Sequence, residues 1–334
     1  MSSDSSLLVL VVTAELDPHA DAVQDALDEL GAEYFRLHPR TLLTDYEIAA
    51  RAESDGGWKI EIEHCSGRRI ELPRERLVGY FRKPQPVEPN PRTRAGDASE
   101  FGAGEGSAFI RGLLRMPGIR WFPAPDAIRA ASAKLPQLAY AQAAGMRIPA
   151  SLVTRSPSEA VAFAGEHGGQ VICKRLGAQP VLTTERLVLY TNRVSAEDLE
   201  RDEEAISQAP VLLQEEIEKE YELRVVVIGT EVIACRIDSQ SNERSQVDWR
   251  IVDPFDLQHE IVKLPPDTEA AVRRFLSDQS LDFAVLDLAL TPDGHYVFFE
   301  NNPNGQWYWI ELITGFPLAE RVARYLKKLA SPIS

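Results

Sequence analysis

The chain has 334 residues, 44% hydrophobic and 26% charged, a composition typical of soluble globular proteins with two or three structural units. The formal net charge of −15 argues against a nucleic-acid partner, because phosphate binding requires a basic face. No apolar run approaches the ~18 residues of a membrane-spanning helix, and the N-terminus lacks the pattern of a signal peptide, so we expect a cytoplasmic protein with no membrane partner.

The first third of the chain has the pattern of a parallel α/β unit. Residues 7 to 14 form a continuous apolar run suited to a buried strand. Asp17 and Pro18 mark a helix start, Gly31 marks its end, and EYFRLH predicts the next strand. WKIEIEH and RRIEL alternate like a hairpin, and LVGYFRKP predicts another buried strand. For residues 85 to 107, which contain GAGEG, we expect a flexible loop, because no strand leads into these glycines.

The rest of the chain predicts a small α+β unit followed by two hairpins. Residues 126 to 145 are expected to be helical with a break at Pro136. SPSEAVAFAGEHG then predicts a capped helix, QVICKRL and LVLYTNRV predict strands, and SAEDLERDEEAISQA predicts one helix. LLQEEIEKEYELRVVVIG, the hairpin at residues 283 to 302 and a final helix at 317 to 330 follow. We predict domains at residues 1–120, 121–215 and 216–334.

Several common kinds of site are missing from the sequence. Cys65, Cys173 and Cys235 lie far apart and form no CxxC pair, which argues against a disulfide scaffold and a zinc site. There is no GxxxxGK[ST] phosphate loop, no GxSxG nucleophile elbow and no HExxH. A Walker-type NTPase and the common hydrolases are therefore poorly supported.

Charged residues in apolar segments are the first candidates for function. Lys134 and Lys174 lie in a predicted helix and strand, where exposed edges explain most lysines and an anionic partner is the alternative. Asp287 and Glu300 lie on apolar strands joined by the turn TPDGH, and Asn302 shares the face of Glu300. These three residues offer only oxygen ligands, which suits Mg²⁺ that holds phosphate oxygens. Together with two lysines, they outline a nucleoside triphosphate site.

A second group of charges lies in and after the hairpin that begins near residue 221. Glu222 and Arg224 are two residues apart and therefore share a face of the strand. They form either a simple ion pair or part of a ligand face. In the second case, Arg236 and Arg250 add cationic groups suited to phosphate.

The order of these segments resembles the ATP-grasp superfamily. The matching pieces are KLPQLAYAQAAGMRIPASLVT, VICKRLGAQPV, LLQEEIEKEYELRVVVIG and DLAL followed by FFENNPNGQW. The segment ENNPNGQWYWIELITGFPLAERVARYL, with GYFRKP and VDWR, is more narrowly similar to ATP-grasp maturases of ribosomal peptides, the graspetide or microviridin-type macrocyclases. This resemblance implies an α/β, ATP-grasp fold: an N-terminal parallel α/β (pre-ATP-grasp) domain, a central helix with a small α+β lid domain, and a C-terminal domain with the metal site.

The resemblance also implies roles for the candidate residues. ATP phosphates would be contacted by Lys134 and Lys174, and Mg²⁺ would be held by Asp287, Glu300 and Asn302. The remaining implied roles are adenine binding by Gln214, Glu215 and Ile217, ribose binding by Glu222, and catalysis at the phosphates and acyl phosphate by Arg224, Arg236 and Arg250. One departure is the segment after Lys174, RLGAQPVLTTE, which has one glycine where many members of the superfamily have several.

The activity implied by the resemblance is ATP-dependent ligation within a ribosomal precursor peptide that has a leader and a core. Asp or Glu side chains would be activated as acyl phosphates, and Ser, Thr or Lys side chains would attack to form esters or amides. The alternatives are an ATP-grasp carboxylate-amine ligase that adds an amino acid to a small molecule or a protein tail, and a non-catalytic nucleotide-binding regulator. Relatives of this kind are often dimers, so the resemblance also allows a homodimer.

Overall fold

The computed structural model describes residues 7–52, 54, 56–93, 96–177 and 192–330. The chain forms two compact units, one of residues 1–128, 306–311 and 317–334, and the other of residues 129–305 and 312–316. No helix among the described residues is long and apolar enough to cross a membrane. The three domains at 1–120, 121–215 and 216–334 stay a prediction. Residues 178–191 lie outside the described residues, and they include most of RLGAQPVLTTE and the first part of the predicted strand LVLYTNRV.

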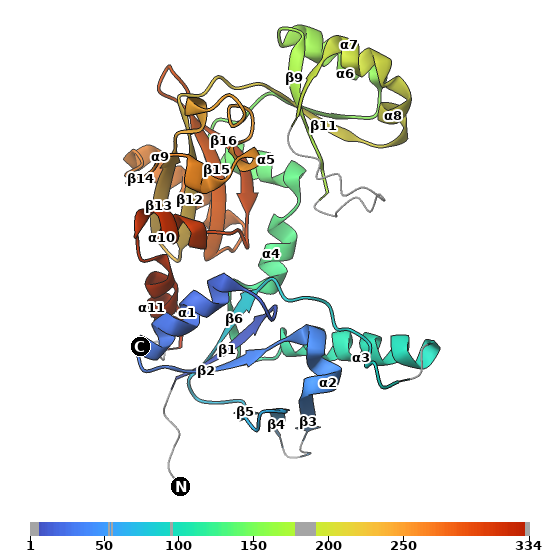
Figure 1. The fold of residues 1–334 in the computed structure, drawn as a ribbon, viewed down its shortest axis with the longest axis vertical. Coiled ribbons are helices and arrows are strands. Elements are labelled where there is room, and N and C mark those ends of the chain that lie inside the picture. The colour runs from blue at the N-terminus through green and yellow to red at the C-terminus, as the bar shows by residue number, and fades with distance from the viewer. Residues whose placement is uncertain (1–6, 53, 55, 94–95, 178–191, 331–334) are drawn as a thin grey trace. The chain divides into compact units, whose positions relative to one another are not determined.

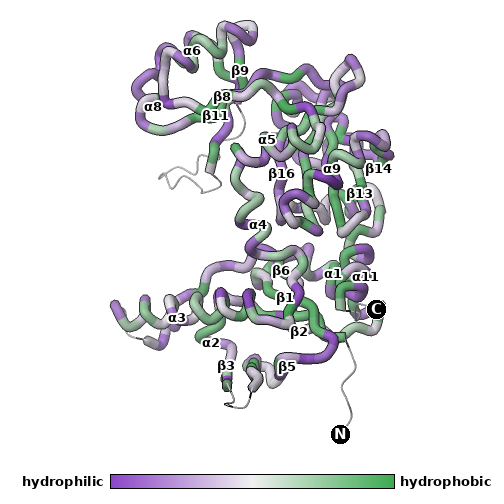
Figure 2. Tube along the Cα trace, turned by 180° about the vertical axis from the view of Figure 1, so that it is seen from behind, coloured by the Kyte–Doolittle hydropathy of each residue, from purple (hydrophilic) through white to green (hydrophobic). Residues whose placement is uncertain are grey.

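A parallel sheet forms the centre of the first unit (Figure 1). Its order is β2-β1-β6-β7, with bounds β1 (Leu8–Thr13), β2 (Glu33–Leu37), β6 (Leu77–Arg82) and β7 (Arg120–Phe122). Every residue of β1 is buried, which explains its unbroken apolar run, visible as hydrophobic colouring in Figure 2. Helix α1 (Pro18–Glu29), capped by Asp17 as predicted, packs against α11 (Leu318–Leu329).

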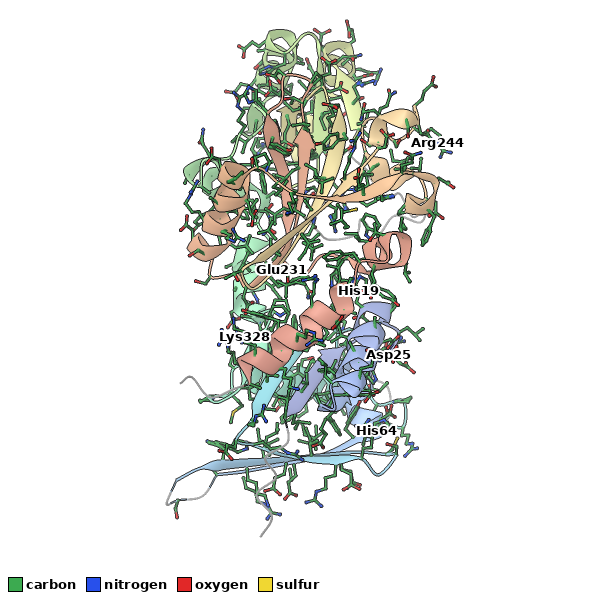
Figure 3. The ribbon with its side chains drawn as sticks, turned by 90° about the vertical axis from the view of Figure 1, so that its left-hand side faces the viewer. His19, Asp25, His64, Glu231, Arg244 and Lys328 are labelled. Atoms are coloured by element: carbon green, nitrogen blue, oxygen red, sulfur yellow. The ribbon has the colours of Figure 1, made fainter. Side chains whose placement is uncertain are left out.

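A second, antiparallel sheet covers the core of this unit. Its order is β3-β4-β5, with bounds β3 (Tyr46–Ala52), β4 (Trp58–His64) and β5 (Arg69–Leu72), so the predicted hairpin is confirmed. Ile60, Ile62, Ile70 and Leu72 alternate into the core. Figure 3 shows this sheet edge-on, with His64 at the end of β4. The sheet therefore presents one apolar face inward and one charged face outward.

The flexible loop predicted for residues 85 to 107 is wrong in its second half. Helix α3 (Asp97–Leu113) includes GAGEG, and the short helix α2 (Leu42–Asp45) packs against it. Ile110 and Leu113 are buried in the core, and this tertiary packing outweighs the poor helix propensity of glycine. Gly106 also permits close approach, because a Cβ there would lie 2.9 Å from Cγ1 of Val87.

The predicted helical stretch at residues 126 to 145 consists of α4 (Pro125–Ala131) and α5 (Lys134–Ala143). The break lies before Lys134, and the prediction of a break at Pro136 is wrong. Pro136 lies in the first turn of α5, where a backbone N–H has no partner within the helix and its loss is harmless.

A small antiparallel sheet of the second unit carries helices on one face (Figure 1). Its order is β10-β9-β11-β8, with bounds β8 (Ser151–Thr154), β9 (Gln170–Lys174), β10 (Asn192–Ser195) and β11 (Val211–Glu215). Val171 and Leu213 pack against the helices α6 (Pro157–Glu166), α7 (Ala196–Arg201) and α8 (Glu203–Gln208). The single helix predicted from SAEDLERDEEAISQA is thus two short helices, which meet at Asp202.

The larger sheet of this unit is antiparallel, in the order β14-β13-β12-β15-β16. Its helices α5 and α9 (Pro266–Asp278) contact one another, and Phe275 of α9 packs against Phe298, with ring centroids 5.2 Å apart. The short helix α10 (Tyr308–Thr314) follows the last strand. The strand bounds are β12 (Tyr221–Ile228), β13 (Glu231–Ile237), β14 (His259–Val262), β15 (Phe283–Leu290) and β16 (Tyr296–Asn302).

Candidate nucleotide and metal site

Strand register brings the central charges of the larger sheet onto one face. Arg224 lies opposite Asp287, and Asp287 lies opposite Glu300. Residues directly opposite each other in a sheet point to the same side, and Glu222 joins them because it is two residues from Arg224. Nη1 of Arg224 donates to Oδ1 of Asp287 at 2.7 Å, and both side chains are buried. The sequence left open an ion pair between Glu222 and Arg224; in the structure Arg224 pairs with Asp287, and Glu222 pairs with Lys219.

A β-bulge adds Phe299 to this face. The register shifts between Asp287 and Leu288, so that Asp287 pairs with Glu300 while Leu288 pairs with Phe298. Phe299 is the extra residue, and it lines the same pocket as Glu300. Its ring lies 5.1 Å from Nζ of Lys174, within the range of a cation–π contact.

The small sheet also contributes residues to the site, from the face that its helices do not cover. Gln214 lies opposite Ile172, and Lys174 is two residues from Ile172, so all three share a face. Nε2 of Gln214 donates to the Ser151 hydroxyl at 2.9 Å. Oε1 of Gln214 is buried and has no hydrogen-bond partner among the described residues. A ligand with an N–H donor would satisfy this oxygen.

One pocket collects most of the predicted site residues. It is lined by Lys174, Gln214, Glu215, Ile217, Glu222, Arg250, Asp287 and Glu300. Sequence reasoning missed several further lining residues, namely Pro149, Ile172, Glu216, Lys219, Val247, Asp248, Trp249 and Phe299. The acidic segment QEEIEKE and the VDWR motif contain many of these residues, so a local signal existed for them. The structure thus brings the charged and apolar parts of the predicted site together.

Cations surround Glu300 within this unit. Nζ of Lys134 lies 3.7 Å from Oε1 of Glu300, and Nη1 of Arg250 lies 4.0 Å from Oε2. Burial lowers the pKa of Lys174 to about 8, although the charge of Glu300 works in the opposite direction. Lys134 lines a smaller neighbouring pocket with Lys174, Gln214 and Glu300. This concentration of positive charge suits a polyanionic ligand.

Arg250 is held by a buried carboxylate that the sequence did not single out. Nε and Nη2 of Arg250 donate to Oδ1 and Oδ2 of Asp248, each at 2.8 Å, and the Arg250 backbone N–H donates to Oδ1 at 3.1 Å. Asp248 is only 3% exposed. Burial works against the charge of Arg250, but the hydrogen bonds and charge of Asp248 raise its pKa overall. The guanidinium is therefore fixed at the pocket and fully charged.

The three predicted metal ligands lie together and supply only oxygen. Nδ2 of Asn302 donates to Oδ2 of Asp287 at 3.3 Å, which leaves Oδ1 of Asn302 available to a cation. Among the described residues, no group of three His, Cys, Asp or Glu side chains could hold a metal. The predicted set differs from such a group, because its third member, Asn302, is an amide. Two carboxylates and an amide oxygen fit Mg²⁺, whose remaining positions are usually filled by water and phosphate oxygens.

Arg236 is the predicted residue that the structure does not bring to this face. It lies opposite Leu223, so it points to the other side of the sheet from Arg224. Its guanidinium carbon lies 4.2 Å from the centroid of the Tyr221 ring, which shares the face of Leu223. On its other flank it lies opposite Glu260 of β14, so its neighbours on that side include a carboxylate as well as Leu223 and Tyr221.

The fold and the sequence are similar to known peptide ligases. A RiPP-associated ATP-grasp ligase from Chryseobacterium gregarium, solved with ADP and a leader and core peptide, is 26% identical, with a TM-score of 0.87 and coverage of 97% of this chain and 98% of that one. The macrocyclase MdnB from Microcystis aeruginosa is 28% identical, with a TM-score of 0.75 and coverage of 96% and 99%. The resemblance to ATP-grasp maturases of ribosomal peptides that the sequence indicated is confirmed.

Another macrocyclase has the same fold as this chain. MdnC from Microcystis aeruginosa, bound with the precursor peptide MdnA, is 24% identical, with a TM-score of 0.82 and coverage of 96% of this chain and 100% of that one. No protein-family model and no curated protein matches the sequence. The ATP-grasp fold expected from the sequence is confirmed, and the chain is an ATP-grasp ligase.

Proposed function

We propose that this ATP-grasp ligase uses ATP to activate Asp or Glu side chains of a ribosomal precursor peptide and closes ester or amide crosslinks within that peptide. The observation that carries the proposal is the pocket in which cations, oxygen ligands and the unpartnered Gln214 oxygen meet, in a chain that matches peptide ligases over nearly its whole length. Transfer of the γ-phosphoryl group to a carboxylate releases ADP. Attack by a Ser, Thr or Lys side chain on the acyl phosphate then releases phosphate.

The proposal assigns a role in nucleotide binding to each of these residues. Oε1 of Gln214, which has no hydrogen-bond partner among the described residues, accepts from the adenine amino group, and Glu215 and Ile217 line the pocket with it. Glu222 receives the ribose hydroxyls, and Lys134 and Lys174 contact the phosphates.

Charge stabilisation accounts for the rest of the chemistry. Arg224 and Arg250 lie on the same side of the sheet as the proposed metal ligands and stabilise negative charge on the transferred phosphoryl group. Asp287, Glu300 and Asn302 would hold Mg²⁺, which neutralises phosphate charge when bound. Arg236, on the other face of the sheet, has no role in this proposal.

Incubation with ATP, Mg²⁺ and the cognate precursor tests the function. The peptide should lose one water for each linkage, and ADP and phosphate should appear in equal amounts. The loss should disappear when the acidic residues of the core peptide are replaced. A peptide that gains the mass of an amino acid would support the carboxylate-amine ligase instead, and nucleotide binding without any turnover would support a regulator.

The partner and location expectations also belong to this proposal. The peptide partner rests on relatives that were solved with leader and core peptides. A homodimer and a cytoplasmic location are carried over from the sequence analysis. Sedimentation of the purified chain would test the dimer.

A further inference from the structure

A buried lysine that has no role in the proposed function lies at the nucleotide pocket. Lys219 precedes β12, and its side chain is only 8% exposed. Lysine is rarely buried without a compensating partner, because its charge must leave water. Nζ donates to Oε1 of Glu222 at 2.8 Å and to the Val247 carbonyl at 3.2 Å. It also lies 5.8 Å from the centroid of the Phe299 ring.

These contacts join two separate parts of the pocket. Glu222 belongs to β12, whereas Val247 belongs to the segment that continues into Asp248 and Arg250. An ammonium group has three donors, and two of them are used here, one for each part. Lys219 therefore fixes the Glu222 carboxylate relative to the segment that carries the Arg250 guanidinium.

The Lys219 contact favours the charged form of Glu222. Its side chain is 7% exposed, and burial raises its pKa, against the opposing charge and hydrogen bond of Lys219 and a hydrogen bond from Ser239. An ionised carboxylate accepts two hydrogen bonds from vicinal hydroxyls, whereas a protonated carboxyl group also carries a donor. Loss of Lys219 would leave Glu222 either neutral or free to turn.

We propose that Lys219 is a positioning residue for nucleotide recognition, which holds the Glu222 carboxylate in the orientation that receives the ribose hydroxyls. The proposal rests on the proposed function, because it takes Glu222 as the ribose group. Lys219 acts through Glu222 and does not itself contact the phosphates. Its loss should therefore change recognition of the sugar more than recognition of the rest of the nucleotide.

The test compares two nucleotides that differ only in the sugar. Affinities for ADP and 2′,3′-dideoxy-ADP, each with Mg²⁺, are measured by calorimetry on the wild-type chain, Lys219→Met and Lys219→Arg. The wild type should prefer ADP by ~10-fold or more, because hydrogen bonds to a charged group discriminate strongly. Lys219→Met should bring the ratio close to one, and Lys219→Arg should keep most of it, because the cation remains.

Controls separate this proposal from the function on which it rests. Lys59→Met removes a lysine that pairs with Glu61 and Glu71 in the other unit, and it should leave both affinities unchanged. If Lys219→Met does not fold, Lys219→Gln takes its place with the same expected loss of the ratio. A wild-type ratio retained in these variants overturns the role of Lys219 while the nucleotide site stands. Failure of the wild type to bind ADP overturns both.

Discussion

Replacing Lys174 with methionine should stabilise the nucleotide-free protein while it weakens nucleotide binding. Burial lowers the pKa of Lys174 to about 8 from an ordinary 10.5. Between these values the unfolded state binds a proton that the folded state does not, so this group makes stability rise as pH increases from 8 to 10.5. Below pH 8 the cost of the buried charge is fully present. Lys174→Met should relieve that cost at neutral pH.

The size of the effect follows from the gap between the two pKa values. At ~1.36 kcal/mol per pH unit, the gap corresponds to roughly 3 kcal/mol. Lys174 lines an open pocket and is only partly shielded from water, so we expect about 1–2 kcal/mol of extra stability at pH 7. Affinity for ATP should fall ~10- to 100-fold, because one charged hydrogen bond to phosphate is lost.

Urea denaturation at pH 7 and pH 10 measures the first effect, and calorimetry with a non-hydrolysable ATP analogue measures the second. The stability difference between Lys174→Met and wild type should shrink toward pH 10. Lys59→Met is a control that should not stabilise the protein at pH 7, because hydrogen bonds to Glu71 and Glu61 raise the pKa of that exposed lysine and so favour its charged form in the folded state. A Lys174→Met protein that is less stable at pH 7, or a difference that does not change with pH, would refute the electrostatic argument.

Two further predictions concern the catalytic charges. Chelation of Mg²⁺ and Glu300→Gln should each abolish turnover, and full activity in EDTA would rule out the proposed metal site. Glu300→Gln should also lower the thermal stability, because Glu300 lies near the cations Lys134 and Arg250. Asp248→Asn removes a charged acceptor of Arg250, so kcat should fall ~10-fold or more while KM for ATP changes less. An unchanged kcat in folded Asp248→Asn would show that the orientation of Arg250 does not limit the reaction.

The periodicity of apolar residues was sufficient to predict much of the fold. The unbroken apolar run at residues 7 to 14 corresponds to a strand buried on both faces, and Asp17 caps the helix that follows. Helix α3 could not be predicted in this way, because its glycines disfavour a helix and its stability depends on contacts with distant residues such as Leu42. The local sequence pattern does not predict those contacts.

The side of the sheet to which Arg236 points could have been predicted from the sequence. Gly229 and Thr230 form a two-residue turn, since Ile228 pairs with Glu231. A turn of that length fixes the whole register and places Arg236 opposite Leu223. Arg236 was grouped with Arg224 because of its residue type, and counting pairs outward from the turn would have separated them.

The pairing of Asp287 with Glu300 could not be predicted by counting residue pairs from the turn. The hairpin pairs Leu290 with Tyr296 and Leu288 with Phe298, and the same register continued without interruption would set Asp287 opposite Phe299. Glu300 would then pair with Leu286 and point to the opposite face from Asp287, which would leave the proposed metal site without one of its carboxylates. The bulge at Phe299 shifts the register by one residue, so that Glu300 lies opposite Asp287. Phe299 also supplies the aromatic ring beside Lys174. The ligand set and its aromatic neighbour therefore arise from a single irregularity, which neither the turn sequence nor the alternation of polar and apolar residues predicts.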